Sequence, residues 1–213
     1  MLLQIDASAQ KSVLSNIPLT GKNIYTFIPK GYDTLEVALG DLNKDEKPDA
    51  VLALRHQSEL NDSIDVMPHR VLLILFKEND GYRLAGKSEK VLLGKDEGGV
   101  YGDPYNGIII KNNVLDVSHY GGSSWRWYLS RKFRYQNGGF YLIGSTNDSY
   151  HISSDCGDDD DVTDGNRNYK DINYVTGEQE IIENDNHCKT IKHTKNKIRK
   201  KPLVKLEAFK YNI

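Results

Sequence analysis

Residues 41–54 read Asp41-Leu42-Asn43-Lys44-Asp45-Glu46-Lys47-Pro48-Asp49-Ala50-Val51-Leu52-Ala53-Leu54, an acidic turn that runs directly into a short apolar segment. Before the turn, Leu35, Val37 and Leu39 occupy every second position, which is the pattern of a strand with one buried face. After the turn, residues 50–54 form an apolar run of strand length, which predicts a buried strand. The turn is therefore expected to be held at both ends by strands.

The spacing of oxygen-bearing residues in this turn predicts a calcium site. Calcium takes six to eight oxygen ligands, and side chains at alternate positions of a tight turn converge on one point. Asp41, Asn43 and Asp45 would supply side-chain oxygens, Lys47 a backbone carbonyl and Asp49 a closing carboxylate. The alternative is a turn without an ion, held by its own side-chain to backbone hydrogen bonds.

Residues 40–51, entered and left by strands, resemble the FG-GAP or VCBS calcium-loop repeat of integrin-like β-propellers and secreted bacterial proteins. The loops of dockerins and EF-hands are similar, but they continue into a helix. The resemblance covers residues 35–54 and occurs as a single copy, because residues 161–166 lack the ligand spacing. The family usually has Gly after the third ligand, where this chain has Glu46, and a residue with a Cβ enters the left-handed conformation at a cost. Residues 107–127 are more loosely similar to segments of exported bacterial proteins that carry the acidic turn.

The rest of the chain predicts a mainly β fold, built from antiparallel hairpins in a meander with partial propeller-like sheets. Short β-type runs alternate with Gly, Asn and Asp turns, and helical periodicity is almost absent. We expect a tail over residues 1–20 and a single all-β domain over residues 21–213, with a charged hairpin region over about 153–205. Four hairpins are predicted: 71–76 with 82–84, 107–110 with 114–117, 125–135 with 140–143, and 171–174 with 179–182.

Composition narrows the function classes. The chain has 213 residues and a net charge of -2, which predicts no general attraction to nucleic acid. No apolar run approaches the roughly 20 residues needed to span a bilayer, so no transmembrane segment is predicted.

The N-terminus and the cysteines bear on localisation. Ala7-Ser8-Ala9 has the small-x-small form of a signal-peptide cleavage site, although only residues 1–6 precede it. It is either the remnant of a signal peptide or a chance match. Cys156 and Cys188 flank a predicted hairpin, and we predict a disulfide between them, with two separate thiols as the alternative. A periplasmic or extracellular location is the expectation that follows.

Two oppositely charged blocks occupy the last third of the chain. Residues 155–185 are rich in Asp and Glu, and residues 189–210 are rich in Lys. Mutual neutralisation by strands that fold back is the preferred interpretation, and an exposed polybasic ligand site is the alternative.

Aromatic residues in the longest predicted strand are the other candidate ligand-binding group. Trp125 and Trp127 would form a sugar-stacking platform with Tyr128 if they were exposed, but their alternation with polar residues favours the core. No catalytic residues are predicted: the histidines lack zinc spacing, and Ser123 and Ser124 lack the context of a nucleophile elbow.

These observations favour an exported, calcium-binding β-module with a non-enzymatic role, directed at a protein or an envelope glycan. A carbohydrate-binding or carbohydrate-processing protein is the alternative, and an immunity or inhibitor protein is a further one. Oligomeric state is left open by the sequence.

Overall fold

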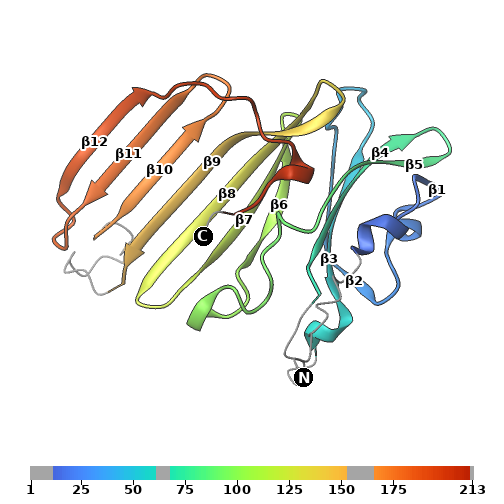
Figure 1. Ribbon diagram of the computed structural model, residues 1–213, viewed down its shortest axis with the longest axis horizontal. Helices are drawn as coiled ribbons and strands as arrows, with labels where there is room; N and C mark the ends of the chain where they lie inside the picture. Colours follow the sequence, from blue (N-terminus) through green and yellow to red (C-terminus); the bar gives the residue numbers. More distant parts are fainter. Residues whose placement is uncertain (1–11, 61–67, 153–165, 212–213) are drawn as a thin grey trace, which may run out of the picture.

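The computed structural model describes residues 12–60, 68–152 and 166–211, and it consists of two antiparallel β-sheets (Figure 1). The predicted mainly β fold is confirmed. The five-stranded sheet has the order β1-β5-β4-β3-β2 and contains β1 (Thr20–Gly21), β2 (Tyr32–Gly40), β3 (Asp49–His56), β4 (Val71–Glu78) and β5 (Gly81–Ser88). The seven-stranded sheet runs from β12 to β6 in order and contains β6 (Tyr105–Lys111), β7 (Val114–Gly122), β8 (Trp125–Gln136), β9 (Gly139–His151), β10 (Asn168–Asn173), β11 (Glu178–Asn184) and β12 (Thr190–Lys197).

Short 3-10 helices are the only helical elements among the described residues. They are η1 (Val13–Asn16), η2 (Ile24–Phe27), η3 (Gln57–Leu60), η4 (Gly99–Tyr101) and η5 (Leu206–Ala208). No helix in the described part of the chain has the length and apolar character needed to cross a membrane.

The four predicted hairpins form β4–β5, β6–β7, β8–β9 and β10–β11. Their turns show why the prediction succeeds. Asn112 and Asn113 both have positive φ, as do Asn137 and Gly138. Asn and Gly enter this region more readily than other residues, and the resulting turn matches the twist of the strands that it joins.

The five-stranded sheet is covered on both faces. One face packs against residues near the N-terminus, where Ile17 is 6% exposed and Phe27 is fully buried. Residues 12–20, assigned to a tail from the sequence, are thus part of the fold: they contribute η1, Ile17 and β1, which pairs with β5. The buried strand expected at residues 50–54 is the centre of β3.

The other face of this sheet packs against the seven-stranded sheet to form the main core. Phe133 on β8 and Phe140 on β9 are fully buried there. The C-terminal segment closes this core, because Phe209 packs edge-on against Phe133 with ring centroids 5.7 Å apart. At the seam between the sheets, the Glu36 carboxylate on β2 accepts a hydrogen bond of 2.7 Å from the Tyr105 hydroxyl on β6.

Strands β10, β11 and β12 extend away from the five-stranded sheet (orange to red in Figure 1). Acidic β11 lies beside basic β12, and Glu183 pairs with Lys192 at 2.5 Å while Glu180 pairs with Lys195 at 3.1 Å. Among the described residues, the acidic block is therefore paired with the basic block along these two strands, in agreement with the preferred interpretation; residues 155–165 of the acidic block lie outside the described residues.

Candidate functional site

The acidic turn connects β2 to β3, whose paired residues Gly40 and Asp49 define its ends. A strand leaves the turn, as expected from the apolar run that follows it. Lys44 and Glu46 have φ values of 69° and 65°. Glu46 thus adopts the left-handed conformation that the sequence marks as costly for a residue with a Cβ, at about 1–2 kcal/mol.

The Asp41 carboxylate stabilises this turn by hydrogen bonds to the backbone of the turn. Its Oδ1 accepts hydrogen bonds from the backbone N–H groups of Lys44 at 2.6 Å and Asp45 at 3.3 Å, and its Oδ2 accepts one from Glu46 at 3.2 Å. Its backbone carbonyl accepts a hydrogen bond of 2.8 Å from Asn113 Nδ2. The turn is therefore tied to the β6–β7 hairpin of the other sheet.

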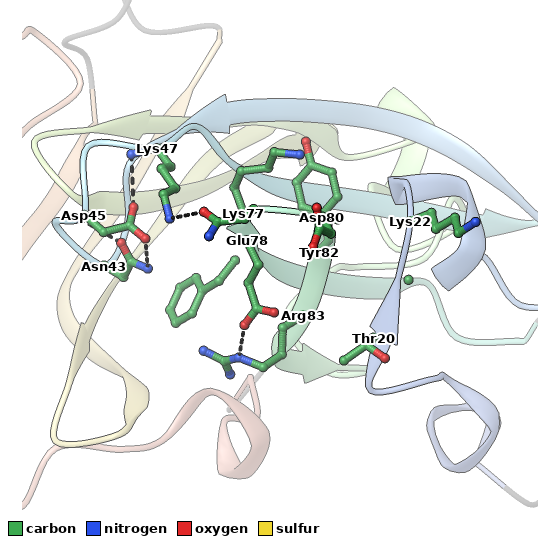
Figure 2. A pocket seen from close by; sticks show the side chains of 14 residues that line it. Thr20, Lys22, Asn43, Asp45, Lys47, Lys77, Glu78, Asp80, Tyr82 and Arg83 are labelled. Carbon is green, nitrogen blue, oxygen red and sulfur yellow. Dashed lines mark hydrogen bonds and ion pairs between the residues drawn. The ribbon is translucent and has the colours of Figure 1, made fainter.

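The middle of the turn is exposed and lines an open pocket of about 700 Å³ beside the β4–β5 hairpin (Figure 2). Asn43 Oδ1 accepts from the N–H of Asp45 at 3.0 Å, and Asn43 Nδ2 donates to Asp45 Oδ2 at 3.2 Å. Asp45 Oδ1 accepts from the N–H of Lys47 at 3.0 Å, and this bond lowers the pKa of the Asp45 carboxyl. Lys47 Nζ reaches Asn79 Oδ1 at 3.4 Å, so its charge is directed at the neighbouring hairpin.

Asp49 is fully buried at the start of β3. Burial raises the pKa of its carboxyl, and hydrogen bonds from backbone N–H groups act against that rise. Its Oδ2 accepts from the N–H of Leu42 at 2.9 Å, and its Oδ1 accepts from the N–H of Lys77 on β4 at 2.8 Å. Asp49 thus holds the far end of the turn against the adjacent strand.

The turn carries oxygen donors of the kind that calcium takes, but its side chains bond to one another and to the backbone, as in the alternative without an ion. Within the described residues, no three His, Cys, Asp or Glu side chains gather closely enough to hold a metal ion. The Asn43 and Asp45 side chains would have to turn from their mutual hydrogen bond to place two oxygens on an ion. Asp41 and Asp49 keep spare lone pairs, since a carboxylate offers about four acceptor sites.

The candidate aromatic residues do not form one platform. Trp127 and Tyr128 are consecutive on β8 and therefore point to opposite faces of the sheet. Trp125 is 43% exposed and contacts His151 edge-on, so the expectation that it lies in the core is wrong. The reason is position: Trp125 begins β8, roughly 25 Å along the strand from the buried Phe133 at about 3.3 Å per residue. Burial raises the pKa of the Tyr128 hydroxyl.

Cys156 and residues 1–11 lie outside the described residues, so the disulfide and the signal-peptide remnant stay predictions. Cys188 lies in the turn between β11 and β12 with a φ of 59°. Its N–H donates to the Asp185 carbonyl at 3.1 Å.

A second candidate site is a groove of about 880 Å³ on the seven-stranded sheet, called here the basic groove. Sequence reasoning raised a polybasic site for residues 189–210 as an alternative but missed the contributions of Arg131 and Lys170. It lies between β8–β11 and residues 198–211. Its deepest cation, Arg131, is 9% exposed. Arg131 lies two residues from both Leu129 and Phe133, so its side chain is on the same face of the strand as theirs. A charged residue on this largely apolar face is the sequence feature that could have indicated the site.

The chain matches no protein-family model, and it matches no curated protein. Functional assignment therefore rests on the two sites themselves.

Proposed function

We propose that this protein is a calcium-binding β-module with a non-enzymatic binding role outside the cytoplasm. One observation carries the proposal: the Asp41 carboxylate holds three successive backbone N–H groups while Glu46 adopts a left-handed conformation. A calcium loop likewise needs a tight backbone path with oxygen-bearing residues at alternate positions, and Asp41, Asn43 and Asp45 have that spacing. A β-turn that needed only to reverse the chain would not require so costly a residue at this position.

The frame around the turn supports the same proposal. One end is fixed by Asp49, which accepts from the N–H of Lys77 on β4, and the other by Asn113 of the β6–β7 hairpin, which donates to the Asp41 carbonyl. Only the half-buried Asn43 and the exposed Asp45 side chains have to move, so the ordering required for binding is small. Calcium loops in extracellular modules often bind at about 10⁻⁴ to 10⁻³ M, which suits a location where calcium is abundant.

Calorimetric titration and thermal unfolding with millimolar CaCl₂ test this proposal. We expect a saturable heat and a rise in Tm with calcium, and a much smaller response to MgCl₂, whose strict octahedral geometry the turn does not offer. Asp45→Asn removes one exposed carboxylate and should weaken calcium binding by about tenfold, since site charge sets affinity. Asp80→Asn, in the β4–β5 turn, removes an equal charge close by and should leave binding unchanged. Absence of any calcium response in the unaltered protein would sink the proposal.

Carbohydrate binding is the alternative that a specific observation favours, namely the exposed ring of Trp125. One exposed ring can stack on a sugar without the Trp127 and Tyr128 rings. A glycan array on which no glycan is bound would remove this alternative.

A further inference from the structure

The floor of the basic groove is a single face of the seven-stranded sheet. Backbone register places Arg131 opposite Ser145, Ser145 opposite Ile172, and Ile172 opposite Gln179. Side chains of directly paired residues lie on the same face, so these four form one row across β8, β9, β10 and β11. Lys170 lies two residues along β10 and therefore shares this face.

The wall of the groove is the chain after β12, which runs along one end of the sheet (Figure 1) until Phe209 and Tyr211 lie against β8 and β7. Tyr211 fixes this segment. Its hydroxyl donates to the Val91 carbonyl at 3.3 Å and lies 3.2 Å from His119 Nδ1. The groove is thus preformed by the fold.

The charge of the groove has one sign. Among the described residues that line it, none is Asp or Glu. Six are basic: Arg131, Lys170, Arg199, Lys200, Lys201 and Lys210. None of these six forms an ion pair within the described chain, in contrast to Lys192 and Lys195 on the neighbouring strand. Within the described part of the chain, ion pairing of the basic block therefore stops at the end of β12.

Arg131 is the strongest element of the site. Its Nη1 donates to the carbonyls of Ser130 at 2.8 Å and Thr146 at 3.1 Å, and its guanidinium lies over the Tyr211 ring at 5.2 Å. These contacts fix its orientation but leave Nε and Nη2 without a hydrogen-bond acceptor in the described chain. Burial of a guanidinium without a carboxylate partner is costly, and an incoming carboxylate would relieve that cost through a bidentate pair.

We propose that the basic groove binds an acidic, partly apolar peptide segment of a partner protein, with Arg131 pairing a carboxylate at its deepest point. The apolar lining favours a peptide over a purely charged polymer, because Ile172, Leu203 and Val204 offer carbon surface between the cations. A strand that alternates acidic and apolar side chains satisfies both features. A sulfated glycan would use the cations alone.

The proposal is independent of calcium, and it is tested with the full chain in EDTA. Fluorescence anisotropy measures binding of a labelled peptide that alternates glutamate and valine. We expect saturable binding that weakens with salt, and no binding of the matched peptide that alternates lysine and valine. Lys200→Glu combined with Lys201→Glu reverses two exposed cations of the groove and should weaken binding by about tenfold.

A matched control separates the groove from net charge. Lys30→Glu combined with Lys111→Glu makes the same charge change at exposed positions away from the groove and should leave binding unchanged. Arg131→Gln, confirmed as folded by circular dichroism, should weaken binding on the order of a hundredfold.

Three results would overturn the proposal: no binding of the acidic peptide at millimolar concentration, equal losses in the two double variants, or binding of a heparin oligosaccharide in place of the peptide. The last result would assign the groove to a sulfated glycan. Because EDTA removes calcium throughout, none of them affects the proposed ion site.

Discussion

The strand pairs β3–β4 and β11–β12 are both antiparallel neighbours, yet they are stabilised in different ways. Residues 50–54 and 71–75 are completely buried, with apolar side chains against both faces of the sheet. In β12, Ile191 is 63% exposed, and the pair is joined by surface ion pairs such as Glu180 with Lys195. Apolar burial yields about 25 cal/mol per Å², whereas an exposed ion pair contributes at most about 1 kcal/mol.

The two strand pairs therefore differ in role: the buried pair stabilises the fold, and the exposed pair lies beside the proposed ligand groove. The five-stranded sheet supplies a core covered on both faces, and its exposed end carries the acidic turn. The outer strands of the seven-stranded sheet contribute little burial, but their uncovered face supplies the floor of the basic groove. A ligand surface has to stay uncovered, so it lies where the second sheet does not reach.

The largest test of this contrast substitutes one apolar residue in each pair. Leu73→Ala in β4 should lower the free energy of unfolding by roughly 4 kcal/mol, because a fully buried Leu leaves a cavity behind. Ile191→Ala in β12 should change it by less than about 0.5 kcal/mol, because its side chain is mostly in water. Urea denaturation of both variants gives the two values. Similar losses in both would show that the outer strands share in the core.

The strands and turns of this molecule could be predicted because their signals are local. The Asn-Gly turn of β8–β9 and the apolar run of β3 each lie within a few consecutive residues. The acidic turn also carries its geometry in its own sequence, down to the strained Glu46.

Other features depend on contacts between distant residues, which a pattern cannot reveal. Trp125 and Phe133 follow the same alternation, and only the extent of the second sheet decides which of them is buried. Arg131 is part of a groove because Tyr211, far along the chain, returns to lie over it. The two charged blocks likewise predict pairing in general, but not that the ion pairs among the described residues end at β12, before Arg199.

A second test addresses the junction of the two sheets, where His119 is fully buried. Its Nε2 accepts from the N–H of Leu93 at 3.1 Å, which requires a neutral ring with the proton on Nδ1, directed at the Tyr211 hydroxyl. Burial, followed by the charges of Arg70 and Arg131, lowers its pKa to about 4, and Asp103 acts against this.

The sign of the resulting pH dependence follows from proton binding. Between a pH of about 6.5 and about 4 the unfolded chain takes up a proton on this histidine that the folded protein excludes. Stability should therefore fall by roughly 3 kcal/mol from this group as pH decreases through that window, and stay level above it. Urea denaturation at a series of pH values measures the fall. His119→Gln should remove this component of the slope, and an unchanged difference between variant and parent across the window would contradict the assignment.

The smallest expected effect on stability is at the acidic turn, where the backbone strain is confined to the turn and no core residue is involved. Glu46→Gly should raise the free energy of unfolding by about 1 kcal/mol, because Gly adopts a φ of 65° without the Cβ penalty. Glu46→Gln removes the charge but keeps the Cβ, so it should have little effect on stability. If the Gln variant gains as much as the Gly variant, then charge repulsion among the carboxylates, and not the left-handed backbone, is what the turn has to overcome. Calcium titration of the Glu46→Gly and Glu46→Gln variants then shows whether removing the strain also raises calcium affinity. We expect a gain for the Gly variant, since a turn without strain in the left-handed conformation costs less free energy to order on binding.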